Sequence, residues 1–116
     1  MAYKLEKINE LIRQELSGIL LREEEFGEGV LATILSAETT EDQKETTVTI
    51  SVWPDTARDS VMKKLNAHIW PLQQLLNKRL KIHPVPKVRF EMNTDEATSQ
   101  QVDELIQKIK QEEAND

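Results

Sequence analysis

The spacing of apolar residues predicts that the chain begins with a helix. From residue 3 to about residue 22 they recur every three or four positions, so one stripe of the helix would face a core. That stripe consists of Leu5, Ile8, Leu11, Ile12, Leu16, Ile19 and Leu20. Gly27 and Gly29 then interrupt the pattern, after consecutive glutamates at 23–25. We interpret these glutamates as a solvated helix end and not as a metal or acid–base cluster, because adjacent carboxylates on one turn diverge.

Three strands are expected after this helix. Residues 30–38 are rich in β-forming side chains, and residues 46–53 alternate strictly between apolar and polar. The polar stretch between them predicts a hairpin loop in which Glu41 and Asp42 form the turn. A third alternating segment spans residues 87–92. The inward-facing residues of the last two strands would be Val48, Ile50, Val52, Val88, Phe90 and Met92.

A helix interrupted by proline is predicted between the hairpin and the third strand. Asp55 or Thr56 would cap its N-terminus. Pro71 has no N–H to donate and its ring clashes with the preceding turn, so the helix must kink or end near Trp70. A second helical segment would then begin with Pro71 at its first position. The two segments would bury Val61, Leu65, Ile69, Leu72, Leu75 or Leu76, and Leu80.

The expected element order indicates a two-layer fold. A last helix, capped by Thr94 or Asp95, would bury Val102, Leu105, Ile106 and Ile109. A three-stranded sheet with helices on one face is an α+β sandwich, here one domain over residues 1–110 with a polar tail at 111–116. This order is that of a KH-like domain of the bacterial topology, in which the turn between paired helices faces single-stranded RNA. The usual GxxG loop is absent, because no glycine lies near the break.

Charge is distributed unevenly along the chain. The net charge is −6, yet residues 60–90, which we call the basic segment, contain no aspartate or glutamate. Its seven cations are Lys63, Lys64, Lys78, Arg79, Lys81, Lys87 and Arg89. A cationic face on an anionic body is suited to holding phosphate while the rest stays soluble. The alternatives are a merely solvated basic surface and a face that docks on an acidic protein.

Composition excludes several kinds of chemistry. The chain has no cysteine, which rules out disulfides, thiolate chemistry and cysteine-based zinc sites. His68 and His83 are its only histidines, and their basic surroundings lack the carboxylates that a zinc site would need. No phosphate-binding loop, dinucleotide fingerprint or nucleophile–base set is visible. We therefore expect no enzymatic activity, no metal and no cofactor. Without a membrane-length apolar run of about 20 residues or a signal peptide, we expect a cytoplasmic protein and no membrane partner.

Blocks of sequence spread over residues 4 to 109 resemble a known family. They are KINELIRQEL at 7–16, DQK at 42–44 before VTISV at 48–52, LNKRLK at 76–81, VPKVRF at 85–90, and DELI at 103–106. In order and spacing they are similar to bacterial ribosome-binding factor A, a KH-like family in which a kinked helix pair replaces the GxxG loop. The resemblance implies a factor that associates with the immature small ribosomal subunit and assists late maturation and processing of its rRNA. It implies no reaction of its own.

The chain departs from this family at the kink. The family usually carries an Ala-x-Gly pattern where this chain has His68, Ile69 and Trp70 followed by Pro71, and only Ala67 is small. We interpret Trp70 as a core residue beside the break; the alternative is a surface on which a base could stack.

Ten residues are candidates for RNA contact: Lys63, Lys64, His68, Lys78, Arg79, Lys81, Lys87, Arg89, Arg13 and Lys44. Those before and after the break could embrace an RNA backbone that passes it. For three of them a structural role is an open alternative. Arg13 could pair with neighbouring glutamates, Lys44 could support the hairpin turn, and His68 could be partly buried. The expected partners are the small subunit and its rRNA, and the free protein is expected to be a monomer. A protein–protein adaptor or a diverged KH-like module for another RNA remain alternatives.

Overall fold

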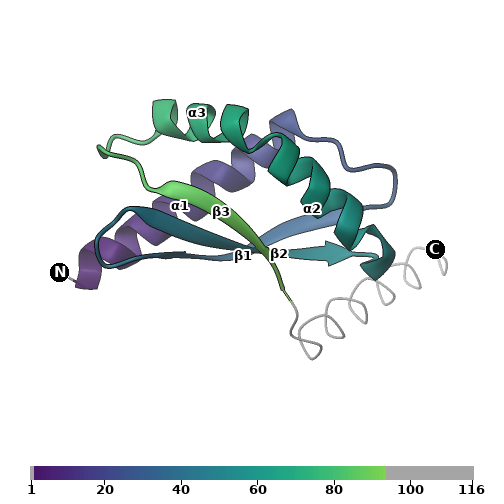
Figure 1. The fold of residues 1–116 in the computed structure, drawn as a ribbon, viewed down its shortest axis with the longest axis horizontal. Helices are drawn as coiled ribbons and strands as arrows, with labels where there is room; N and C mark the ends of the chain where they lie inside the picture. Colours follow the sequence, from purple (N-terminus) through teal and green to yellow (C-terminus); the bar gives the residue numbers. More distant parts are fainter. Residues whose placement is uncertain (1, 94–116) are drawn as a thin grey trace, which may run out of the picture.

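A three-stranded sheet carries α1, α2 and α3, the helices among the described residues, on one face (Figure 1). The computed structural model describes residues 2–93. Its elements are α1 (Ala2–Glu23), β1 (Leu31–Thr39), β2 (Glu45–Trp53), the 3₁₀ turn η1 (Asp55–Ala57), α2 (Arg58–Ala67), α3 (Ile69–Arg79) and β3 (Lys87–Met92). The expected two-layer α+β class is confirmed. The last predicted helix and its caps lie outside the described residues.

The apolar stripe of α1 forms one wall of the core. Five of its seven predicted members are buried, and the other two, Leu5 and Leu11, are partly exposed. The buried members are Ile8, Ile12, Leu16, Ile19 and Leu20. Because they recur at helical spacing, a single face of α1 packs against β1 and α3.

The hairpin β1–β2 pairs antiparallel, from Leu31 opposite Trp53 to Thr39 opposite Thr46. The register shifts between Ile34 and Ser36, which sets Leu35 apart as a bulge residue. Strand β3 runs parallel to β2, because the α2–α3 pair carries the chain across the sheet before β3 begins. The predicted inward side of both strands is confirmed: Val48, Ile50, Val52, Val88 and Phe90 are buried and Met92 is partly buried.

The helix break lies at His68, three residues before the proline that causes it. His68 has φ −102° and ψ 11°, and α3 begins at Ile69, so the expectation that the second helix starts at Pro71 is wrong. A helix continuing through residue 67 would place the Pro71 ring against the Ala67 carbonyl. With the break at His68, Pro71 falls in the first turn of α3, where a backbone N–H has no partner within the helix.

The predicted cap of α2 is also wrong. Neither Asp55 nor Thr56 caps it: the N-cap is Ala57, without a side-chain hydrogen bond. The chain first makes the turn η1 after Pro54, and Asp55 pairs instead with Arg58 across 3.2 Å.

Gln73 of α3 fixes the start of β3. Its amide nitrogen donates to the Asn77 side chain at 3.0 Å and to the Pro86 carbonyl at 3.1 Å. Its amide oxygen accepts the Val88 N–H at 2.8 Å. These bonds satisfy backbone groups next to the end of the ladder, so the polar contacts of one partly buried side chain position the strand that follows α3.

Candidate nucleic-acid interface

The solvent side of α3 carries an exposed tryptophan. Leu72 and Leu76 face the core, whereas the Trp70 side of the helix points away and the residue is 71% exposed. Trp70, Gln74 and Lys78 follow one another at four-residue spacing along this outer side. The interpretation of Trp70 as a core residue is therefore wrong. Because the break lies at His68, Trp70 belongs to α3, where its spacing of two and six residues from Leu72 and Leu76 places it opposite these buried leucines.

The two adjacent lysines of α2 have different surroundings. Val61 and Leu65 define the buried side of α2. Lys63 lies opposite them and is exposed, and no carboxylate of the described residues is paired with it. Lys64 lies on the flank, where its ammonium donates to the Glu25 carbonyl. The same ammonium stands 5.7 Å from the ring centroid of Phe26, a cation–π distance.

His68 is engaged by a buried glutamate. Its Nδ1 lies 2.8 Å from Oε1 and 3.1 Å from Oε2 of Glu24, so the imidazole donates to the carboxylate. The Glu24 side chain is 3% exposed and that of His68 is 48% exposed. The interpretation of all three glutamates as a solvated helix end is thus wrong for Glu24. Glu24 directly follows α1, and the end of this helix lies close enough to the α2–α3 break for Glu24 to contact His68.

The remaining cations of the helix pair lie at the far end of α3. Lys78, Arg79 and Lys81 are exposed. Because α3 has 11 residues, about 16 Å separate them from the break. Arg79 Nη1 stands 4.0 Å from a Glu15 carboxylate oxygen of α1, at the limit of an ion pair. The cations therefore form a track along two helices and not a clamp closed around the break.

Lys87 and Arg89 lie on the other face of the sheet. Their strand neighbours Val88 and Phe90 are buried toward the helices, and side chains of a strand alternate. Both cations are exposed there. Lys44 is also exposed, and its carbonyl accepts the Lys87 N–H at 2.9 Å, so the hairpin loop adjoins the start of β3.

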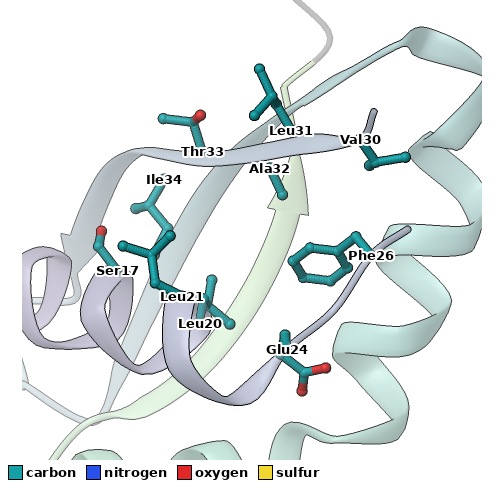
Figure 2. A pocket seen from close by; sticks show the side chains of 10 residues that line it. All are labelled: Ser17, Leu20, Leu21, Glu24, Phe26, Val30, Leu31, Ala32, Thr33 and Ile34. Carbon is teal, nitrogen blue, oxygen red and sulfur yellow. The ribbon is translucent and has the colours of Figure 1, made fainter. Parts of the chain in front are cut away.

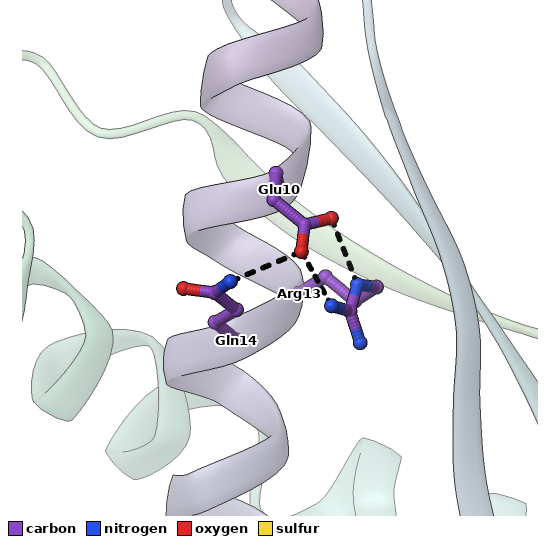
Figure 3. A network of polar contacts seen from close by, with 3 residues as sticks. All are labelled: Glu10, Arg13 and Gln14. Atoms are coloured by element: carbon purple, nitrogen blue, oxygen red, sulfur yellow. Dashed lines mark hydrogen bonds and ion pairs between the residues drawn. The ribbon is translucent and has the colours of Figure 1, made fainter.

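Arg13 is held within its own helix. Its Nε donates to a Glu10 carboxylate oxygen at 3.0 Å, and Gln14 donates to the same carboxylate at 3.1 Å (Figure 3). The hydrogen bond and charge of Arg13 lower the pKa of Glu10, while Glu10 raises that of Arg13. The alternative of an intrahelical pair is what the structure shows for this residue.

The structure therefore brings together only part of the predicted set. Lys63, Lys78 and Arg79 lie on α2 and α3, and Lys81 lies directly after α3; we call these four residues together with Trp70 the helix surface. Lys87 and Arg89 belong to the opposite face. Sequence reasoning missed Glu24, Phe26 and Gln73. Only the apolar character of Phe26, directly after three glutamates, gave any local signal of burial.

No group of three or more metal-ligating side chains occurs among the described residues. Within the same part of the chain, every helix is too short or too polar to cross a membrane.

Comparison with known proteins agrees with this architecture. The sequence model of the family "Ribosome-binding factor A" matches residues 4–106, which is most of the chain. The chain belongs to the ribosome-binding factor A family. Members of this family are ribosome maturation factors without enzymatic activity. This agrees with the expectation, drawn from the sequence, that the protein is not an enzyme.

Individual relatives show how far the sequences have diverged. Ribosome-binding factor A of Akkermansia muciniphila is 30% identical over 93 residues, which cover 80% of this chain and 74% of the relative. That of Halothermothrix orenii is 26% identical, with 95% and 91% covered.

Solved structures share the fold at lower identity. The crystal structure of ribosome-binding factor A from Thermus thermophilus superposes with a TM-score of 0.65 at 15% identity, covering 76% of this chain and 94% of that one. A homology model of the Thermus thermophilus factor, fitted into a cryo-EM map of its complex with the 30S subunit, has a TM-score of 0.60 at 15% identity. It covers 70% of this chain and 86% of that one.

Proposed function

We propose that this family member binds the immature small ribosomal subunit in the bacterial cytoplasm and assists late maturation and processing of its rRNA. Membership of the family supports this role, and the Thermus thermophilus relative has been placed in a complex with the 30S subunit. RNA contact would be made by the helix surface.

One observation carries the choice of the helix surface. Three arginines of the described chain have a carboxylate within 4.0 Å, on Glu10, Asp55 and Glu15. Lys63, Lys78 and Lys81, in contrast, have no carboxylate within 4.0 Å among the described residues. Lys87 and Arg89 on the opposite face are unpaired in the same way, but only the helix surface combines unpaired cations with an exposed aromatic ring, that of Trp70. Charges that are not neutralised within the protein are available to replace the counterions of phosphates. Two unneutralised lysines on α2 and α3, a third directly after α3, and the exposed Trp70 between them therefore favour a polyanion running over this layer.

Trp70 would supply the non-electrostatic part of binding. It is exposed between the lysine of α2 and the cations at the end of α3, and its indole has no core role. A base stacked on an aromatic side chain contributes about 1–3 kcal/mol without requiring a particular sequence. In this chain a stacking platform would take the place of the small-residue kink typical of the family.

The salt dependence of binding tests the mechanism. Contact with all four cations of the helix surface, for which Arg79 would exchange its 4.0 Å pair with Glu15 for a phosphate, should give a log–log slope near −2.8 with single-stranded RNA, because each neutralised phosphate contributes about −0.7. A slope near −3.5 would require contact with a fifth cation outside the helix surface. Salt-insensitive binding would overturn the proposal.

Paired charge reversals test the surface. Lys63→Glu with Lys78→Glu should abolish most co-sedimentation with immature small subunits at moderate salt. Lys87→Glu with Arg89→Glu makes the same change of charge on the opposite face of the sheet, and it should have a much smaller effect. Equal losses would place the contact elsewhere. Co-sedimentation that survives nuclease treatment of the small subunits would instead indicate docking on a ribosomal protein.

A further inference from the structure

An apolar hollow of about 390 Å³ lies where α1 ends and β1 begins. It is lined mainly by Leu20, Leu21, Phe26, Val30, Ala32 and Ile34. Figure 2 shows Leu20, Leu21 and Phe26 directed toward it, and Ala32 and Ile34 entering it from the strand, whereas the Glu24 carboxylate points away. Leu21 is 86% exposed although it borders the hollow. A leucine this exposed beside an apolar cavity is a feature typical of binding grooves.

The hollow adjoins a free strand edge. Within residues 2–93, β1 pairs with β2 alone, so its outer edge has no neighbouring strand. At the far end of β1, the Thr39 N–H is satisfied by the Asn9 side chain of α1 at 2.8 Å. At the other end of β1, near Leu31, the apolar hollow lies beside the strand edge. Strand β1 is nine residues long and has neither lysine nor proline, the usual means of blocking an edge.

The surroundings of the hollow are acidic. Residues 23–43, which we call the acidic segment, contain seven acidic residues and no lysine, arginine or histidine. Glu23, Glu25 and Glu28 are exposed beside the lining residues, while Glu24 is paired with His68. Two cations are near. The Lys64 ammonium lies over the Phe26 ring. The Arg22 guanidinium folds back beside Gly18 of its own helix. The charge beside the groove therefore remains negative.

We propose that this groove binds an extended, lysine- or arginine-rich peptide segment of a partner protein. The segment would pair its backbone with the free edge of β1 and place one apolar side chain in the hollow, a strand-addition mode. Its basic residues would face Glu23, Glu25 and Glu28. Basic arms of this kind are common in proteins that bind nucleic acid. A second copy of this chain fits less well, because it would bring the same acidic segment to the same edge.

Short synthetic peptides and the full chain test this proposal. The probe carries lysines at both ends and a Val-Leu-Val centre, and its matched control has glutamates in place of the lysines. The lysine peptide should bind saturably, with NMR shift changes confined to residues 17–36. The glutamate peptide should bind at least about tenfold more weakly. Equal binding of both peptides, or shift changes centred on α3, would overturn the proposal.

Variants separate the groove from the rest of the surface. Leu21→Ser removes an exposed wall of the hollow and Ala32→Leu fills it, and each should weaken the lysine peptide by about tenfold or more. Trp70→Ser removes another exposed apolar side chain, this one from the helix surface, and should leave peptide binding unchanged. A concentration-dependent dimer in sedimentation that Leu21→Ser abolishes would assign the edge to a second copy and contradict the proposal.

Discussion

The acidic segment and the basic segment carry equal numbers of opposite charges, but they bury their leucines to different extents. Each holds seven charges of one sign. The leucines of the basic segment at 65, 72, 76 and 80 are buried, whereas Leu31 and Leu35 of the acidic segment are exposed. The basic segment thus buries most of its leucines, and apart from the exposed Trp70 it presents mainly charge. The acidic segment leaves apolar surface open beside its charge, which is why we expect RNA at the first and a peptide at the second.

The two segments touch where the helix pair breaks. Glu24 pairs with His68, and Lys64 contacts Glu25 and Phe26. Two of the predicted RNA-binding residues are therefore engaged by the acidic segment. This difference between neighbours such as Lys63 and Lys64 can be tested.

The largest effect is expected from truncating a buried leucine of the basic segment. Leu65 is 0% exposed, so Leu65→Ala should lower the free energy of unfolding by about 2–5 kcal/mol through lost burial and the cavity left behind. Leu31 is 55% exposed, so Leu31→Ala should change it by no more than about 0.5 kcal/mol. Urea denaturation measures both. Similar costs for the two variants would mean that the acidic segment packs as fully as the basic one.

The contact between the segments should come next. His68→Ala leaves the buried Glu24 carboxylate without its hydrogen-bond donor, which should cost about 1–3 kcal/mol of unfolding free energy at neutral pH. The control is His83→Ala, because His83 is exposed in the connector before β3. If both histidines could be replaced without loss in the same denaturation assay, the Glu24–His68 bond would not hold the segments together.

A smaller effect should distinguish the two adjacent lysines. Lys64→Ala removes a cation–π contact and a bond to the Glu25 carbonyl, and should destabilise the fold by about 0.5–1 kcal/mol. Lys63→Ala should leave stability unchanged but reduce the salt slope of RNA binding by about 0.7. Thermal unfolding and RNA titrations at several salt concentrations measure the two quantities. A loss of stability in Lys63→Ala together with a smaller salt slope in Lys64→Ala would mean that Lys63 is the structural lysine and Lys64 the RNA-binding one.

The smallest effect concerns the hairpin turn at the end of the acidic segment. The Thr40 hydroxyl donates to Asp42 Oδ1 at 2.6 Å, and the Lys44 N–H donates to it at 3.1 Å. These bonds, the Thr40 bond first, lower the pKa of Asp42 below the ordinary aspartate value of 3.8. A lowered pKa stabilises the folded turn above pH 3.8, and this contribution is lost as the pH falls through the folded value.

An NMR pH titration of the Asp42 carboxyl carbon measures that pKa directly. Thr40→Val removes the main donor and should move the pKa back toward 3.8, while Thr47→Val on β2 serves as a control and should leave it in place. An Asp42 pKa that does not respond to Thr40→Val would show that the hydroxyl is not its main stabiliser.

Periodicity predicted the elements well because each stripe is a local property. The α1 stripe, the inward sides of β2 and β3, and the proline-induced break all follow from spacing within a few residues. The errors share a different origin. The start of α3 and the exposure of Trp70 depend on where the chain relieves the Pro71 clash, and the fate of Glu24 depends on a residue 44 positions away.

The sequence by itself determined the order of elements, the family and the separation of charge into a basic and an acidic segment. All three depend on local stretches of sequence, so the period of the side chains, short sequence blocks and composition are enough to find them. Only the tertiary structure decided which cations share a face, that Lys64 and His68 are held by the acidic segment, and that a hollow opens beside β1. These features arise from contacts between elements distant in sequence, whose geometry depends on how the helices pack on the sheet.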